Sequence, residues 1–185
     1  MATGTWQGKD IKVWKASTGE LVHTLPTPGT AAALFAPNGK SLITCTAEEF
    51  QFWEVGAWQA DHRLARAAAG NMPGTGAFTK DGKLLAVSHS QEALRLVHPE
   101  NGKEVATLEF PMSRRRNVQC ISPDGSLLVT TGEAIQVWDL RLIRRQLKEM
   151  NLDWDLPDYP PAASLTDPTS PLRVQVLLGE LNPDK

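Results

Sequence analysis

Residues 122–140 read SPDGSLLVTTGEAIQVWDL, a Pro-Asp-Gly turn followed by two short apolar runs that end in Trp-Asp. Related turns stand earlier in the chain, as APNGKSL at residues 36–42 and TKDGKLL at residues 79–85. The three turns share a glycine at an interval of 43 residues: Gly39, Gly82 and Gly125. A constant interval of this length is typical of a structural repeat that packs against copies of itself.

A second mark recurs with nearly the same period. The runs IKVW, FQFW, LRLV and IQVW end at Trp14, Trp53, Val97 and Trp138. The runs are short, they are rich in β-branched residues or alternate between apolar and polar residues, and Gly, Pro, Asn or Asp bounds them. They therefore predict antiparallel strands. The Asn-Gly and Asp-Gly pairs supply the positive φ that a tight hairpin needs. Each unit therefore predicts four short strands.

Four-stranded units of this length that close on Trp or Trp-Asp resemble the WD40-repeat β-propeller family. The resemblance covers residues 1–140 and rests on the period, the turns and the tryptophans, whose expected role is packing between sheets. Only Trp138 is followed by Asp, and the Gly-His pair of the family's fullest pattern is absent. We therefore expect apolar packing, rather than that family's side-chain hydrogen-bond network, to hold the sheets together.

The strand count predicts an all-β fold, a partial WD40-like propeller of about three and a half blades, because closure typically takes four to eight. We expect two full blades near residues 31–66 and 75–110, and incomplete blades at both ends of residues 1–138. Since open sheet edges are a liability, we expect the chain to be the C-terminal part of a larger propeller. Self-association of two copies into one ring is the alternative.

Beyond the repeats, residues 139–151 carry apolar side chains at helical spacing and predict an amphipathic helix with Asp139 as its N-cap. Residues 152–185 predict a Pro-rich, acidic arm, pinned to the propeller by Trp154 and Tyr159, with a possible final strand at residues 172–181. This ending resembles the terminus of large bacterial WD40-repeat proteins. Some members of that family carry an upstream Ser/Thr protein kinase domain.

Charge, apolar stretches and cysteines indicate which classes of partner and which cellular compartment to expect. The formal net charge is −2, from 19 basic and 21 acidic residues, which favours neither nucleic acid nor a membrane surface as partner. No stretch has the length of an apolar membrane span and no signal peptide pattern opens the chain, so we expect a cytoplasmic location. Cys45 and Cys120 lie in apolar runs, and we expect both to be buried and unpaired.

Catalytic motifs are absent from the sequence. There is no phosphate-binding loop, dinucleotide fingerprint, nucleophile elbow or kinase catalytic loop, and the four histidines lack metal-ligand spacing. We expect no enzyme activity, no cofactor and no metal; a redox propeller is a weaker alternative. The expected function is a protein-protein interaction scaffold that binds a protein partner or an upstream domain of its own parent chain. The alternative is the regulatory end of a kinase-type protein whose catalytic domain lies elsewhere.

The strongest local charge is the run Arg114, Arg115 and Arg116, in a loop between two predicted blades. Guanidinium groups bind carboxylates and phosphates by charge-assisted hydrogen bonds, although such a run is more often a solvated loop that discourages edge pairing. Reversing the three charges to Glu is expected to weaken binding of an acidic partner, measured by titration calorimetry. Unchanged affinity would contradict a binding role for this loop.

Overall fold

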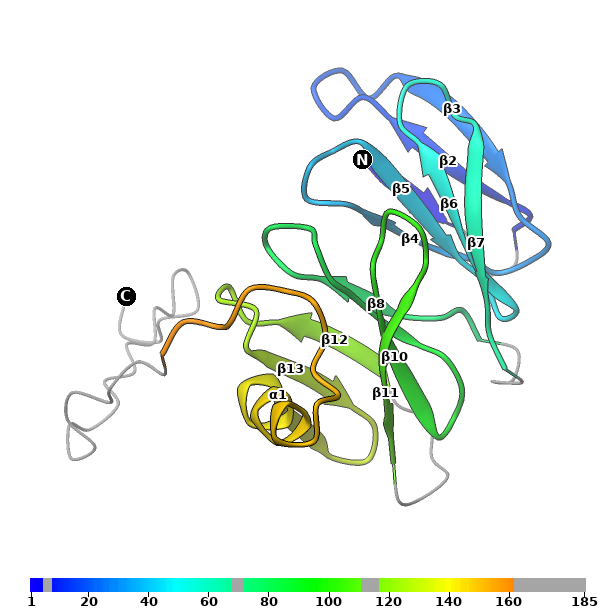
Figure 1. Ribbon diagram of the computed structural model, residues 1–185. Helices are drawn as coiled ribbons and strands as arrows, with labels where there is room; N and C mark the ends of the chain where they lie inside the picture. The colour runs from blue at the N-terminus through cyan, green and yellow to red at the C-terminus, as the bar shows by residue number, and fades with distance from the viewer. Residues whose placement is uncertain (5–7, 68–71, 111–116, 162–185) are drawn as a thin grey trace, which may run out of the picture.

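A computed structural model describes residues 1–4, 8–67, 72–110 and 117–161, and within these ranges the chain forms fourteen strands and one short helix (Figure 1). The strands pair into four antiparallel sheets that follow one another along the chain. The all-β prediction is confirmed, and the repeated sheets are consistent with part of a β-propeller-like fold. Arg114, Arg115, Arg116 and the possible strand at 172–181 lie outside the described residues.

Each sheet is built from consecutive strands. The first sheet contains β1 (Ala2–Gly4), β2 (Asp10–Trp14) and β3 (Leu21–Pro26), which correspond to the second, third and outer strands of a four-stranded sheet. The second contains β4 (Ala32–Phe35), β5 (Ser41–Cys45), β6 (Glu49–Glu54) and β7 (Ala60–Ala65). The third contains β8 (Gly76–Phe78), β9 (Leu85–Ser88), β10 (Ala93–Val97) and β11 (Glu104–Glu109). The last contains β12 (Asn117–Ile121), β13 (Leu127–Thr131) and β14 (Ile135–Asp139).

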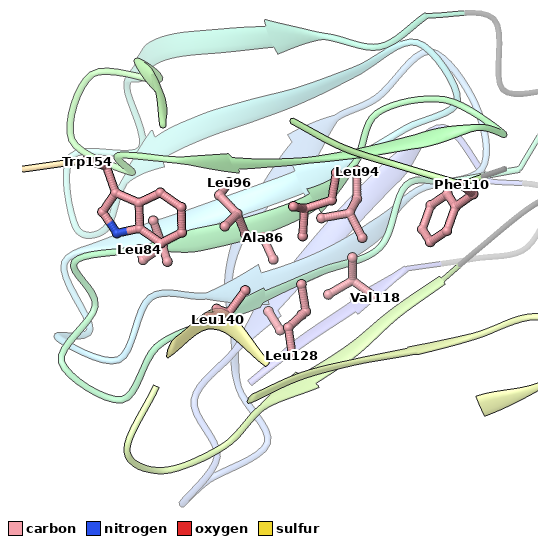
Figure 2. Packing of buried hydrophobic residues seen from close by; sticks show 11 residues of the cluster. Leu84, Ala86, Leu94, Leu96, Phe110, Val118, Leu128, Leu140 and Trp154 are labelled. Atoms are coloured by element: carbon pink, nitrogen blue, oxygen red, sulfur yellow. The ribbon is translucent and has the colours of Figure 1, made fainter. Parts of the chain in front are cut away.

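Apolar side chains fill the space between successive sheets. Three buried groups form the core, one at each junction, and the largest lies between the third and last sheets. There, Leu94 and Leu96 of β10 face Val118 of β12 and Leu128 of β13 (Figure 2). Burial at about 25 cal/mol per Å² makes these junctions the main source of stability.

The hairpin turns between the first two strands of the second, third and last sheets share one geometry. Gly39, Gly82 and Gly125 have φ values of 69°, 71° and 77°, a conformation that side chains with a Cβ rarely adopt. Two residues after Asp124, the backbone amide of Ser126 donates to its carboxylate at 3.1 Å, and the other two turns have equivalent bonds. The repeat therefore preserves a backbone requirement as well as an apolar pattern.

Polar bonds add to the apolar packing that the sequence predicts between the sheets. Within three sheets, a tryptophan indole donates to a threonine hydroxyl of the neighbouring strand: Trp14 to Thr3 at 2.7 Å, Trp53 to Thr44 at 3.0 Å, and Trp138 to Thr130 at 3.4 Å. Between the third and last sheets, the amide of Val118 donates to the hydroxyl of Thr75 at 2.7 Å. Thr75 immediately precedes β8, so this bond ties two sheets together.

The two cysteines differ in environment. Cys45 is buried, and burial raises the pKa of its thiol to about 12. Cys120 is exposed, so the expectation that both are buried is wrong for this residue. The reason is local, because the pairing of β12 with β13 shifts between Val118 and Cys120, and the two side chains that follow the buried Val118, Gln119 and Cys120, are both exposed. An irregular strand pair breaks the simple alternation on which the expectation rested.

The helix and the arm pack against the last sheet. Helix α1 (Leu140–Glu149) begins directly after β14, with Asp139 accepting hydrogen bonds from the amides of Arg141 and Leu142. Leu140 is fully buried against the last two sheets. After α1, Asn151 has a φ of 58°, which turns the chain into the arm, described to residue 161. The arm passes alongside α1 (Figure 1).

Candidate functional site

An internal comparison of the four sheets locates an unusual surface on the last one. Three residues before the end of each apolar run stands a large apolar side chain that faces the following sheet. In the first three sheets this residue is at most 1% exposed: Ile11, Phe50 and Leu94. In β14 the equivalent residue, Ile135, is 75% exposed. A position that is interior in three repeats is thus on the surface in the fourth.

The position two residues further along follows the same rule. Val13, Phe52 and Leu96 are buried against the following sheet, whereas Val137 of β14 is 56% exposed. Ile135 and Val137 lie on the same side of β14, because alternate residues of a strand share a face. No further sheet covers them within the described residues. We call the surface formed by Ile135 and Val137 the open face of the last sheet.

The first sheet shows the reciprocal situation on its opposite side. Leu42, Leu85 and Leu128, on the second strand of the other sheets, are fully buried against the preceding sheet. In the first sheet the corresponding residue is Met1, which exchanges two backbone hydrogen bonds with Trp14 at 2.7 and 2.9 Å. Met1 is 63% exposed. The first and the last of the four sheets therefore each expose a surface of the type that is buried between successive sheets elsewhere.

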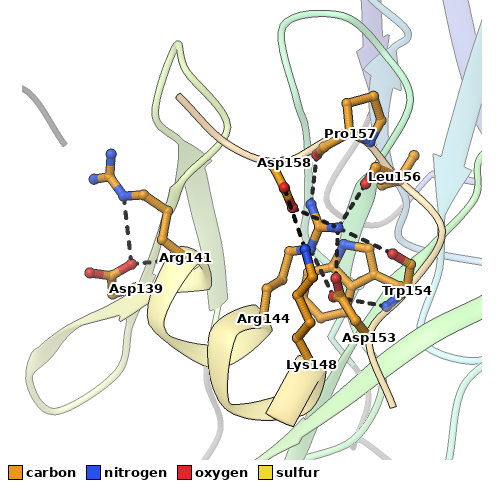
Figure 3. Close-up of polar contacts among 9 residues, drawn as sticks. All are labelled: Asp139, Arg141, Arg144, Lys148, Asp153, Trp154, Leu156, Pro157 and Asp158. Carbon is orange, nitrogen blue, oxygen red and sulfur yellow. Dashed lines mark hydrogen bonds and ion pairs between the residues drawn. The ribbon is translucent and has the colours of Figure 1, made fainter. Parts of the chain in front are cut away.

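The arm is fastened beside the last sheet by Arg144 of α1, whose side chain is only 7% exposed. Its guanidinium binds the carboxylate of Asp153 through two hydrogen bonds of 2.9 and 3.0 Å (Figure 3). It also donates to the carbonyl oxygens of Trp154, Leu156 and Pro157. The hydrogen bond to Asp153 raises the pKa of Arg144 and lowers that of Asp153, so the pair is charged at neutral pH.

Two aromatic side chains attach the arm to the sheets. Trp154 is buried in the core between the third and last sheets, and the Arg144 guanidinium lies 5.3 Å from its ring centroid. Tyr159 lies against Gly125 of the β12–β13 turn, and burial raises the pKa of its phenol to about 12. The arm thus has one aromatic anchor, Trp154, within the stretch that Arg144 binds and a second, Tyr159, just after it.

A groove of about 490 Å³ runs between the arm and two hairpin turns. One wall is formed by the arm around Tyr159 and Pro160, and the other by the turns that contain Asp81 and Asp124. Hydrogen bonds from the Ser122 hydroxyl and from Ser126 lower the pKa of Asp124 to about 2. Both carboxylates already accept hydrogen bonds within their own turns, so they serve first to hold the turns.

The residues singled out in the sequence divide into two groups. Trp53 and Trp138 pack at the junctions with the preceding sheets, Trp138 edge-on against Phe110 at 5.4 Å between ring centroids, and the repeat glycines lie in the turns. Trp14 belongs to none of the three buried clusters of the described residues and donates to Thr3 of its own sheet, so the packing between sheets expected of it is not observed.

An uncovered face on the last sheet follows from the incomplete blades that the sequence predicts at both ends, and aligning IQVW with the earlier runs shows that Ile135 and Val137 belong to it. The role of Arg144 was not predicted. Its signal is a charge at the fourth position after Leu140, on the apolar stripe of the helix.

Two of the histidines, His23 and His62, pack against aromatic rings. His62 stacks on Phe52 at 4.0 Å and His23 on Trp58 at 5.3 Å between ring centroids. Within the described ranges, no three His, Cys, Asp or Glu side chains gather where they could bind a metal ion. In the same part of the chain, no helix is both long and apolar enough to cross a lipid bilayer.

No protein-family model and no curated protein matches this chain.

Equivalent positions in the third and last sheets allow a matched test of the open face. Leu94→Ala is expected to lower the free energy of unfolding by about 2–5 kcal/mol, because it leaves a cavity at a sheet junction. Ile135→Ala is expected to change it by less than about 0.5 kcal/mol, since the side chain is exposed. Urea unfolding of the two variants measures both values. Equal losses would mean that Ile135 is covered in solution.

Removing the guanidinium is expected to release the arm. Arg144→Met leaves Asp153 and three backbone carbonyls without their donor, a loss of about 3–5 kcal/mol for a buried ion pair. Limited proteolysis is expected to cleave this variant rapidly within residues 152–161, and thermal unfolding measures its stability. Arg145→Met, at the exposed neighbouring position, is the control and is expected to behave as the unmodified chain. Equal resistance of both variants would show that the aromatic anchors alone hold the arm.

Proposed function

We propose that this chain is a noncatalytic protein-interaction scaffold, part of a WD40-like β-propeller, and that its last sheet binds another β-sheet through the open face. The observation that carries the proposal is the exposure of Ile135, at a position that is interior in the other three sheets. The surface therefore has the shape and chemistry of a sheet junction, with one side of the junction supplied by this chain.

The described junctions indicate what the partner surface contains. At each of them the pair of apolar residues on the third strand of one sheet faces a leucine on the second strand of the next, as Leu94 and Leu96 face Leu128. Ile135 and Val137 repeat the first half of this arrangement. The complementary surface is thus a β-sheet with a leucine or similar side chain on a strand next to its inner edge.

The energetics favour a partner that covers the whole face. Burying one exposed Ile or Val side chain contributes about 1.5–3 kcal/mol. These two residues therefore supply the apolar centre of an interface, and the surrounding contacts have to come from the rest of the face. Large apolar side chains that lie together on an edge strand are an aggregation hazard when they are left uncovered. This hazard supports a stable, specific partner that covers Ile135 and Val137 rather than a face that stays uncovered.

A photo-crosslinker tests the proposal in the cells that make the protein. p-Benzoylphenylalanine replaces Val137 on the open face, and as a control replaces Leu152, which is exposed in the arm. Position 137 is expected to crosslink to a peptide with the alternation of residues 126–131, identified by mass spectrometry, and position 152 is not.

The identity of the linked peptide separates the possible arrangements. A peptide from this chain indicates a ring of two copies, and a peptide from another polypeptide indicates a larger propeller. A link to a helical or unrelated segment, or no link at position 137, would contradict the proposal that the open face binds a β-sheet.

A further inference from the structure

One side of the first sheet repeats, residue by residue, a surface that the other sheets bury. We call the side formed by Met1, Thr3 and Trp14 the rear face of the first sheet. The pairing of β1 with β2 places these residues where the other sheets have a leucine, a threonine or valine, and a tryptophan or valine. The equivalent sets are Leu42, Thr44 and Trp53; Leu85, Val87 and Val97; and Leu128, Thr130 and Trp138.

Burial separates the rear face from its three equivalents. Met1 is 63% exposed where the three leucines are fully buried, and Thr3 is exposed where its equivalents are at most 3% exposed. The Trp14 indole nonetheless donates to the Thr3 hydroxyl, the bond that Trp53 and Trp138 make with their own threonines. The rear face thus has the arrangement of a junction surface, although it takes part in none of the three buried clusters of the described residues.

The open face of the last sheet has the arrangement of the opposite half of a junction. Val129 of β13 lies opposite Val137 and shares this face with it. The residues equivalent to Val129 in the second and third sheets, Ile43 and Ala86, are fully buried in the clusters there. Val129, Ile135 and Val137 are all apolar, so the centre of the face carries no charge. The chain therefore presents both halves of one junction, on two different sheets.

We propose that the partner of the open face is the rear face of a second copy of this chain, so that two copies close into one ring of eight sheets. The inference rests on the proposed function, because it names the sheet that the open face binds. Ile135 and Val137 of one copy pack on the rear face of the other, as each interior pair packs on the leucine of the next sheet. The contact continues the series of three junctions within each chain.

Symmetry favours this arrangement over other contacts between copies. The junction joins unlike faces and each copy carries one of each, so a two-fold ring contains the junction twice and leaves neither face uncovered. Pairing of two open faces would leave Met1 and Thr3 exposed. Four sheets from each copy give eight, within the four to eight blades of closed propellers. Each junction has to supply only half of the roughly 1,200–2,000 Å² that a stable complex buries.

Sedimentation equilibrium of the 185-residue chain tests the ring. The unmodified chain is expected to sediment at twice the 20.2 kDa of one copy, without larger species. Val137→Lys on the open face and Thr3→Lys on the rear face each place a charge in both junctions, so each variant is expected to sediment as a monomer. Leu152→Lys, in the exposed part of the arm, is the control and is expected to remain a dimer. Circular dichroism verifies that all variants retain their strands.

A mixture of the two monomeric variants gives a result that only a contact between unlike faces predicts. The intact rear face of Val137→Lys meets the intact open face of Thr3→Lys, so one junction forms between them. With one variant labelled with nitrogen-15, native mass spectrometry is expected to show a mixed dimer and neither of the two pure dimers.

Four results would overturn the inference: an unmodified chain that stays monomeric, species that keep growing with concentration, a dimer that Val137→Lys dissociates and Thr3→Lys does not, or a mixture without mixed dimer. The third result would mean that two open faces bind each other. A link in cells from position 137 to a β-sheet of a different polypeptide would also overturn it, while leaving the proposed function intact. Only the absence of any link to a β-sheet contradicts the proposed function itself.

Discussion

The structure depends on one recurring interaction, the burial of two alternate apolar residues of a third strand against the next sheet. Ile11 with Val13, Phe50 with Phe52, and Leu94 with Leu96 perform this role in turn. Each sheet has two faces to cover, and each junction covers one face of two sheets. Because each of the three buried clusters joins two successive sheets, stability is to a first approximation a sum over neighbours, as in other repeat proteins. The two end sheets of such an array each have one face without a neighbour, and the exposed apolar residues Met1, Ile135 and Val137 lie on these faces.

The C-terminal segment stabilises one of these ends in a different way. Helix α1 inserts Leu140 into the last junction, and the arm adds Trp154 to the same core. Arg144 links the two by binding the arm backbone and Asp153 at once. A guanidinium suits this task because its fixed fork of donors satisfies several acceptors in one plane, which a lysine ammonium does not. The helix, the arm and the last sheet therefore form one unit, although the open face itself stays exposed.

Much of the fold was readable from the sequence because its signals are local and repeated. The glycines of the turns and the IQVW-type runs mark strand ends, and the observed strands match them closely. Cys120 was misjudged because a shift in pairing with β13 is not encoded in the alternation of β12. The bonds of Arg144 were beyond reach for another reason, since they join residues that only the path of the arm brings together. The run IQVW identifies Ile135 as one of the apolar pair of the last sheet, but its exposure depends on whether another sheet packs beyond, which the run itself does not encode.

The resemblance between the open face and the interior junctions bears on how such chains change over evolutionary time. Ile135 and Val137 have the same character as the pairs that are buried within the arc. A duplicated unit placed after β14 would therefore find its binding surface already present, without compensating substitutions elsewhere. Loss of the last unit would expose, on the sheet before it, an apolar pair of the same character as Ile135 and Val137. Gene duplication and deletion can thus alter the number of sheets in steps of one repeat, while the geometry of each remaining junction is conserved.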